Sequence, residues 1–333
     1  MSVRFSVVIP VYNVAPFLRE CLDSLLAQTC ADWEAICVDD GSSDGSGEIL
    51  DEYAAKDSRF RVVHQANSGV GLTRNAALDR LRGKWINYLD ADDIMSPRAL
   101  ELFDRGIREN TQADIVVLGY KTLSEEEKPI WGGNDEPEWQ ELDIGSRVPA
   151  VIADQFLWQV SYRADRFGAL RFPNLCFGED AVYCTEVVRK ARLAVCGDAT
   201  AYFYRQRRTS AVHSVRTVKM VLHDICHFRE VLAILERSGK TYPRGYWRKM
   251  GLRLTQYLAA DYAHLSTADR QEVWRAWRPV LGAFANRFGP CGYEKFAAWA
   301  VSRTRSLALM WILCYGVHWL KLHGVNRRLA RHT

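Results

Sequence analysis

The densest group of chemically active side chains in this sequence is Asp90-Ala91-Asp92-Asp93, which directly follows the apolar segment Lys84–Leu89. Three carboxylates within four residues repel one another, and a divalent cation bound by oxygen ligands would neutralise them. Mg²⁺ or Mn²⁺ at this position could also bridge two phosphates of a nucleotide. The group therefore predicts a metal site, and the alternative is a solvated turn at the start of the next helix.

A second acidic group, the pair Glu179-Asp180, lies just before the predicted helix Ala181–Lys190. As a general base, one of these carboxylates would accept the proton of an attacking hydroxyl group. The alternative is purely structural, because the helix dipole stabilises acidic residues at a helix start whatever their function.

A third acidic segment, Asp39-Asp40-Gly41-Ser42, follows the predicted strand Glu34–Val38. One carboxylate at a strand end could accept the imide N–H of uracil, and Asp44 could cap the next helix. A strand, turn and helix cap without any ligand is the alternative.

Two further segments could bind anions. Asn67–Ala76 places glycines before a helix whose first turn carries Arg74, so backbone N–H groups and a guanidinium could hold phosphate. It matches neither the Walker loop nor the dinucleotide fingerprint, and an ordinary loop entering a helix is the alternative. Tyr202–His213 alternates aromatic residues and then clusters arginines, which indicates a strand leading into an anion-facing loop. His213 is a candidate metal ligand or phosphate contact, with a structural histidine as the alternative.

The elements that must position these groups alternate between strands and helices over residues 1–118. This alternation predicts right-handed βαβ units and an α/β fold with a mostly parallel sheet. Such sheets bind ligands outside the carboxyl ends of their strands, and polar residues follow nearly every predicted strand. The expected strands are Arg4–Ile9, Glu34–Val38, Arg61–His64, Lys84–Leu89 and Asp114–Leu118, and the expected helices are Ala15–Gln28, Ser46–Lys56, Val70–Arg82 and Pro97–Glu109, with Ser96 as the N-cap of the last.

Composition excludes several classes of protein. The chain is 48% hydrophobic and 25% charged, which is ordinary for a soluble globular protein and unlike a disordered, collagen-like or coiled-coil chain. Nine scattered cysteines without a C-x-x-C pair argue against a disulfide framework or a structural zinc site and favour a reducing compartment. The apolar run near the start is too short for a signal peptide, and no stretch reaches the length of a membrane-spanning helix.

Taken in order, these motifs resemble the inverting glycosyltransferases of family two, which have a GT-A fold. The resemblance rests on SVVIPVYNVAPFLRECLDSLLAQT, VDDGSSDGS, NSGVGLTRNAAL, LDADD and GED, followed by YFYRQRRTS, as in the branch that builds bacterial surface polysaccharides. It covers about Val3 to His213. It implies a Rossmann-like, mostly parallel central sheet flanked by helices, followed by a mostly helical C-terminal region.

The resemblance also implies roles for individual residues. Asp180 would be the catalytic base, with Glu179 beside it contacting a sugar. Asp92 would be the principal metal ligand. The Q-x-x-R-W motif of the larger synthases is absent, so arginines after the aromatic strand would take its place. The implied nucleotide-sugar contacts are Pro10, Tyr12 and Asp40 at the base, Arg74 near the base and diphosphate, Asp90 and Ala91 at the ribose and metal, and Arg205, Arg207 and Arg208 as the substitute arginines.

The expected reaction is therefore a single displacement that moves a sugar from a UDP-sugar to a glycan or lipid-linked acceptor, with Mn²⁺ or Mg²⁺ as cofactor. This reaction is expected to be a step in the synthesis of a cell-surface polysaccharide, namely lipopolysaccharide, capsule or exopolysaccharide. A processive synthase is not expected, because the chain lacks a multi-helix membrane channel. The alternatives are a nucleotidyltransferase, or a noncatalytic module that binds a nucleotide or glycan.

Charge separates the chain into an acidic body and a basic end. Residues 240–333 hold 16 Lys and Arg against 4 Asp and Glu, although the whole chain has a net charge of only +4. Within them, Leu307–Leu320 is a mostly apolar run that contains two Trp and one Tyr and is flanked by Arg and Lys. This pattern is typical of a helix in a membrane interface, and a buried core helix is the alternative. Nucleic acid is not an expected partner, because no nucleic-acid motif accompanies the charge.

The expected organisation is a GT-A domain over residues 1–215 and a basic helical region over 216–333. Within the first, residues 1–118 would form the nucleotide-binding half and residues 150–215 the acceptor half. Leu123–Ile144 is predicted to be a loop or short hairpin. The enzyme is expected to be cytoplasmic and peripheral on the inner face of the bacterial cytoplasmic membrane, attached to anionic lipid through its C-terminal region.

Overall fold

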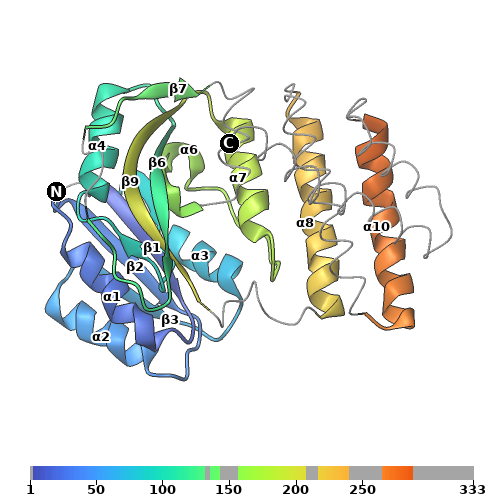
Figure 1. The fold of residues 1–333 in the computed structure, drawn as a ribbon, viewed down its shortest axis with the longest axis horizontal. Helices are drawn as coiled ribbons and strands as arrows, with labels where there is room; N and C mark the ends of the chain where they lie inside the picture. Colours follow the sequence, from blue (N-terminus) through green and yellow to red (C-terminus); the bar gives the residue numbers. More distant parts are fainter. Residues whose placement is uncertain (1–2, 132–135, 143–156, 208–216, 240–264, 288–333) are drawn as a thin grey trace, which may run out of the picture. The chain divides into compact units, whose positions relative to one another are not determined.

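The computed structural model of the chain describes residues 3–131, 136–142, 157–207, 217–239 and 265–287 (Figure 1). The chain divides into two compact units, Met1–Ser214 and Val215–Thr333. The first unit is an α/β domain. The described part of the second unit is helical.

A nine-stranded sheet runs through the described part of the first unit. Its strand order is β3-β2-β1-β4-β8-β6-β9-β5, and β7 pairs with β9. The four strands β1 to β4 are parallel, and β8 is antiparallel to both β4 and β6. The strands are β1 (Phe5–Val11), β2 (Trp33–Asp39), β3 (Phe60–His64), β4 (Trp85–Tyr88), β5 (Ile94–Met95), β6 (Ile115–Ser124), β7 (Gln140–Leu142), β8 (Val160–Arg163) and β9 (Ala194–Gln206).

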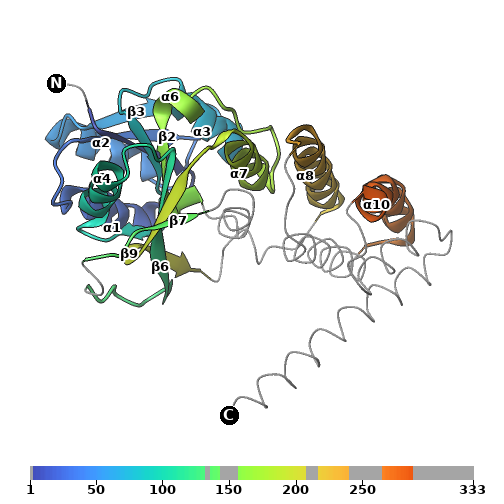
Figure 2. The same cartoon turned by 90° about the horizontal axis from the view of Figure 1, so that it is seen from above.

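Helices cover both faces of this sheet. Figure 2 shows α1, α2 and α4 on one side and α3 and α7 on the other. The predicted α/β fold with a mostly parallel central sheet is confirmed, because β6 and β9 run in the same direction as β1 to β4. The helices are α1 (Ala15–Leu26), α2 (Ser46–Lys56), α3 (Val70–Leu78), α4 (Ala99–Glu109), α6 (Ala164–Phe167) and α7 (Glu179–Lys190), with a 3₁₀ turn at Leu157–Gln159.

The side chains of β1 alternate between the two faces of the sheet, and both faces are buried. Phe5, Val7 and Ile9 are completely buried in the same apolar cluster as Leu18 of α1 and Phe103 of α4. Burying a large apolar side chain contributes roughly 1.5–3 kcal/mol. The opposite face packs against α3. The strands are therefore fixed from both sides, and their carboxyl ends form a rigid edge.

Two helix ends differ from the sequence prediction. Helix α3 stops at Leu78 and not at Arg82, because the chain must turn back at Gly83, where a Cβ atom would lie 2.4 Å from the Ser6 backbone nitrogen. Helix α4 begins at Ala99 with Arg98 as its N-cap, so Ser96 is not the cap. Of the predicted loop Leu123–Ile144, Gln140–Leu142 forms β7 and pairs with β9 instead of closing a hairpin.

Two helices make up the described part of the second unit, α8 (Val218–Arg237) and α10 (Thr267–Arg287). They pack through aromatic side chains, with the ring centroids of Phe228 and Trp277 5.5 Å apart. None of the helices described is long and apolar enough to cross a membrane. His213 and the apolar run Leu307–Leu320 lie outside the described residues.

Candidate functional site

The carboxyl ends of β1 to β4 lie at one edge of the sheet, because these four strands are parallel. The predicted polar segments leave the sheet at this edge. They begin at Pro10 in β1, at Asp39 in β2, at Gln65 after β3 and at Asp90 after β4.

Asp40 fastens two of these segments together. Its side chain is buried, with Oδ1 accepting a hydrogen bond from Ser68 N at 2.9 Å and Oδ2 accepting one from Gly69 N at 2.9 Å. No other described residue donates to Oδ2, so this oxygen keeps a free acceptor position. Tyr12 lies 54% exposed at the same edge.

Asp44 and His64 connect neighbouring segments at this edge through hydrogen bonds. Asp44 accepts hydrogen bonds from Ala15 N at 2.9 Å and Ser46 N at 3.1 Å, so one carboxylate satisfies the starts of both α1 and α2. His64 lies between Asp39 and Asp51, at 3.0 and 3.1 Å, and these two hydrogen bonds raise the pKa of His64. Sequence reasoning missed His64, because a lone histidine at a strand end has no motif.

Arg74 joins the two halves of the site. Its Nη1 donates to Glu179 Oε1 at 2.8 Å and its Nη2 donates to Asp90 Oδ1 at 3.0 Å, and its side chain is only 7% exposed. Gly71 makes this approach possible, since a Cβ atom there would lie 2.8 Å from the carbonyl oxygen of Pro173. The guanidinium expected near the diphosphate is thus held by two carboxylates, and it fixes both of them.

We expect the substitution Arg74→Met to destabilise the first unit. Asp90 and Glu179 would lose their shared cation, and removing one partner of a buried ion pair typically costs about 3–5 kcal/mol. Urea unfolding monitored by circular dichroism measures this difference. Arg80→Met, at an exposed residue just beyond α3, is the control. Equal unfolding free energies for the two variants would contradict the assigned role.

Asp180 lies in the first turn of α7, next to Glu179. The N-cap of this helix is Gly178, whose φ of +74° is a conformation that favours glycine. Asp180 Oδ1 accepts a hydrogen bond from Ala181 N at 2.7 Å. Burial and the neighbouring charge of Glu179 raise the pKa of Asp180 to about 7. A carboxylate with this pKa can take up a proton near neutral pH, as a general base must.

The three carboxylates after β4 separate into two kinds. Asp93 is buried, and its oxygens accept hydrogen bonds from the Tyr202 hydroxyl and from Arg205 N, both at 2.7 Å. The Tyr202 oxygen also accepts a hydrogen bond from Asp90 N at 3.1 Å. Asp93 therefore ties this loop to β9, and only Asp90 and Asp92 remain to contact a ligand.

Asp92 pairs with Arg207, whose Nε lies 2.6 Å from Oδ2, and both side chains are about one-fifth exposed. Burial and the charge of Asp90 raise the pKa of Asp92. Ala91 between them is buried in the apolar core, so its side chain offers no contact to a ligand.

The donor set fits a hard divalent cation, because Mg²⁺ is usually bound by one or two carboxylates together with substrate phosphates. Asp90 and Asp92 supply that number. Among the residues that the structure describes, no group of three His, Cys, Asp or Glu is arranged to hold a metal ion. His213, the other candidate ligand, lies outside them.

Arg205 contacts protein groups with all three of its guanidinium nitrogens. Nη2 pairs with Glu20 at 2.7 Å, Nη1 donates to the carbonyl oxygen of Glu125 at 2.8 Å, and Nε donates to that of Asp92 at 3.1 Å. The side chain is buried. Contrary to the expected nucleotide contact, Arg205 thus holds the loop after β4, and Arg207 is the more accessible arginine. Sequence reasoning missed Glu20, because its partner lies 185 residues away.

This fold is that of a GT-A domain. The solved structure of residues 1–349 of TarS from S. aureus in complex with UDP-GlcNAc superposes with a TM-score of 0.71. That superposition covers 96% of this chain and 92% of the TarS chain, at 18% identity.

Sequence comparison gives the family. The family model described as "Glycosyl transferase family 2" matches residues 6–160. The putative glycosyltransferase EpsH of Bacillus subtilis is 34% identical over 243 residues, which cover 71% of this chain and 70% of EpsH. The uncharacterized glycosyltransferase EpsJ of Bacillus subtilis is 34% identical over 215 residues, which cover 62% of each chain. The chain belongs to glycosyltransferase family 2.

Proposed function

We propose that the chain transfers a sugar from a UDP-sugar to a hydroxyl group of a glycan or lipid-linked acceptor, with inversion at the anomeric carbon. The reaction would be a step in the synthesis of a bacterial cell-surface polysaccharide. The observation that carries this proposal is the Arg74 bridge, which joins Asp90 of the first half to Glu179, next to Asp180, of the second half.

The proposed donor site lies at the carboxyl ends of β1 and β2. Tyr12 is exposed there, directly after β1, and can stack on a base, and Pro10 lies two residues before it in the strand. The free acceptor position on Asp40 Oδ2 suits the imide N–H of uracil. The complex of TarS with UDP-GlcNAc supports a UDP-sugar on the same fold.

Asp180 is the proposed general base. The acceptor oxygen bonds to the anomeric carbon while the bond from that carbon to the diphosphate oxygen breaks. The acceptor proton passes to the carboxylate of Asp180, and the bonding electron pair leaves with UDP. Attack from the face opposite the diphosphate converts an α-linked donor into a β-glycoside.

Asp92 and Asp90 would hold Mn²⁺ or Mg²⁺, which when bound supplies positive charge next to the leaving diphosphate. We assign Arg207, and not Arg205, to the diphosphate, because Arg207 is partly exposed and its ion pair is with Asp92. Arg74 orients Asp90 and Glu179 through its two ion pairs and needs no contact with the nucleotide.

A screen of UDP-sugars for release of UDP tests the proposal against both alternatives. We expect release with at least one UDP-sugar in the presence of Mn²⁺ or Mg²⁺. A noncatalytic module would bind a UDP-sugar without releasing UDP. A nucleotidyltransferase would consume pyrophosphate and form UTP, but its usual glycine-rich loop with a lysine is replaced after β1 by the segment Pro10–Leu18.

We further propose that residues 303–333 hold the enzyme on the inner face of the cytoplasmic membrane. The support is the basic charge around Leu307–Leu320, because each basic residue near anionic lipid contributes about 1 kcal/mol. Deleting 303–333 should release the protein from anionic vesicles and leave hydrolysis of the UDP-sugar intact. Added salt should weaken the attachment of the full-length protein, because charges are screened beyond about 8–10 Å. A truncated protein that misfolds and loses hydrolysis would show instead that this segment is part of the core.

A further inference from the structure

A cavity lies at the edge of the sheet opposite the candidate site, at the amino ends of β1 and β4. Its volume is about 680 Å³, and Arg4, Lys84, Trp85, Ile107, Arg108 and Arg163 are among its lining residues. β1 has seven residues that rise about 3.3 Å each, which places the cavity roughly 20 Å from the carboxyl ends of the strands. The cavity is therefore separate from the proposed transfer site.

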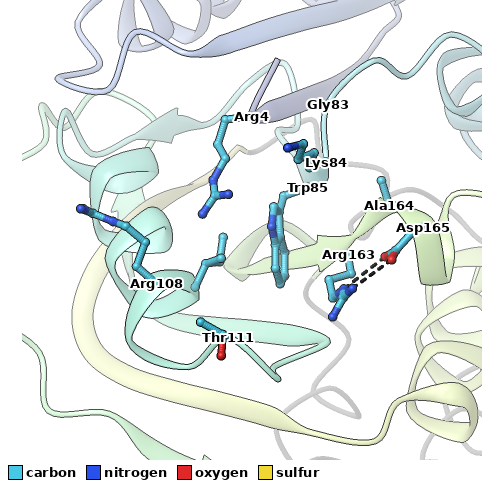
Figure 3. Close-up of a pocket in the computed structure, with 10 residues that line it drawn as sticks. Arg4, Gly83, Lys84, Trp85, Arg108, Thr111, Arg163, Ala164 and Asp165 are labelled. Carbon is cyan, nitrogen blue, oxygen red and sulfur yellow. Dashed lines mark hydrogen bonds and ion pairs between the residues drawn. The ribbon is translucent and has the colours of Figure 1, made fainter. Parts of the chain in front are cut away.

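The cavity combines an apolar floor with cationic side chains. Trp85 and Ile107 belong to the apolar core and contribute its floor. Figure 3 shows the Arg4 guanidinium pointing into the space beside the Trp85 ring, while Arg163 turns toward Asp165. Arg163 and Asp165 form two hydrogen bonds, at 2.9 and 3.1 Å, and neutralise each other.

The cations on the other side of the cavity outnumber their acidic partners. Arg4 and Arg108 share the single carboxylate of Asp104, each through Nε, at 2.7 and 2.8 Å. Within the described part of the chain, their terminal nitrogens have no acceptor, and the exposed Lys84 ammonium has no ion pair. The terminal nitrogens of Arg4 and Arg108 and the ammonium group of Lys84 are thus free to bind an anion.

This excess of positive charge is local. The unit Met1–Ser214 contains 24 Lys and Arg against 33 Asp and Glu, a net charge of −9. A cluster with a net charge of about +2 in so acidic a unit attracts anions to one place. Guanidinium groups fit phosphate oxygens in a bidentate geometry.

We propose that this cavity binds the phosphate group of a ligand that also carries an apolar part. The phosphate faces Arg4, Lys84 and Arg108, and the apolar part lies against Trp85 and Ile107. A phosphate has more acceptor oxygens than a carboxylate, which suits the three cations. The same chemistry is found in a phospholipid headgroup and in a soluble organic phosphate.

Calorimetric titration of the full-length protein tests this proposal with two monomeric probes, phenyl phosphate and dihexanoylphosphatidylglycerol below its micellar concentration. Vesicles are avoided, because the basic residues 240–333 would attract an anionic bilayer by themselves. The double variant Lys84→Ser with Arg108→Ser should weaken binding of the preferred probe at least tenfold. Inorganic phosphate, which lacks an apolar part, should bind the unmodified protein more weakly than phenyl phosphate.

The matched control is the double variant Arg19→Ser with Lys56→Ser. These two exposed cations both pair with the carboxylate of Glu52 and do not line the cavity. The control should bind both probes as the unmodified protein does. Tighter binding of the lipid probe would identify a headgroup as the ligand, and tighter binding of phenyl phosphate a soluble organic phosphate. Binding that is absent, equal in both double variants, or no tighter for phenyl phosphate than for inorganic phosphate would overturn the proposal.

Discussion

Replacing Asp180 with Asn is expected to lower sugar transfer by about 10²-fold or more, the scale of a general-base contribution. Asparagine keeps the shape of the side chain but cannot accept the acceptor proton. Binding of the UDP-sugar should stay unchanged, because Asp180 acts on the acceptor. Single-turnover release of UDP measures the first effect, and calorimetric binding of the donor measures the second.

The pH dependence of the unmodified enzyme should carry the signature of the same residue. Asp180 must be ionised to accept a proton, and its pKa is raised to about 7. The transfer rate should therefore fall as pH drops below about 7 and level off above it. The residual activity of Asp180→Asn should lack this step.

Glu186→Gln provides a control, because Glu186 lies on the same helix and pairs with Arg189 away from the Arg74 bridge. It should transfer sugar at nearly the normal rate. Normal transfer by Asp180→Asn, or an inactive Glu179→Gln beside an active Asp180→Asn, would assign the base to another residue.

Replacing Asp92 with Asn is expected to abolish metal-dependent turnover while the protein stays folded. The substitution removes one of the two carboxylates left for a cation after Asp93 is engaged by Tyr202 and Arg205. Turnover would be measured as UDP release during titration with Mn²⁺ or Mg²⁺. Electron paramagnetic resonance of Mn²⁺ in the presence of UDP reports metal binding without turnover.

Asp79→Asn is the control for this experiment. Asp79 is exposed and pairs with Arg171, so its loss should change neither metal binding nor turnover. Circular dichroism of both variants checks the fold. Near-normal activity of Asp92→Asn with unchanged metal dependence would show that Asp92 is not a metal ligand.

Much of the fold could be predicted because its signals are local. The first four strands are short buried runs, and each lies within one or two residues of its predicted position. Helix ends were less predictable, because tertiary contacts determine them. The end of α3 is an example, because it depends on the close approach of Gly83 to Ser6, which no local sequence pattern indicates.

The candidate site could be predicted as a set of residues but not as a network. Local spacing indicates carboxylates at strand ends and at the start of α7. It contains no information on the bond between Arg74 and Glu179, which are 105 residues apart. For the same reason local spacing does not distinguish Arg205 from Arg207, or Asp92 from Asp93, and only the family resemblance names Asp92 as the metal ligand. Burial and long-range partners distinguish them, leaving Asp92 and Arg207 partly exposed.

Inverting transfer can be tested by the anomeric configuration of the sugar first released from UDP-N-acetylglucosamine, the nucleotide sugar in the TarS complex. Water can replace the acceptor in a slow hydrolysis, and time-resolved proton NMR distinguishes the two anomers before they interconvert. If this nucleotide sugar is accepted as a donor, we expect the β-anomer to appear first, with the metal present and Asp180 intact. If it is not, the same measurement applies to the UDP-sugar that the screen identifies. Initial release of the α-anomer, or no UDP release from any UDP-sugar, would contradict the proposed inverting transfer.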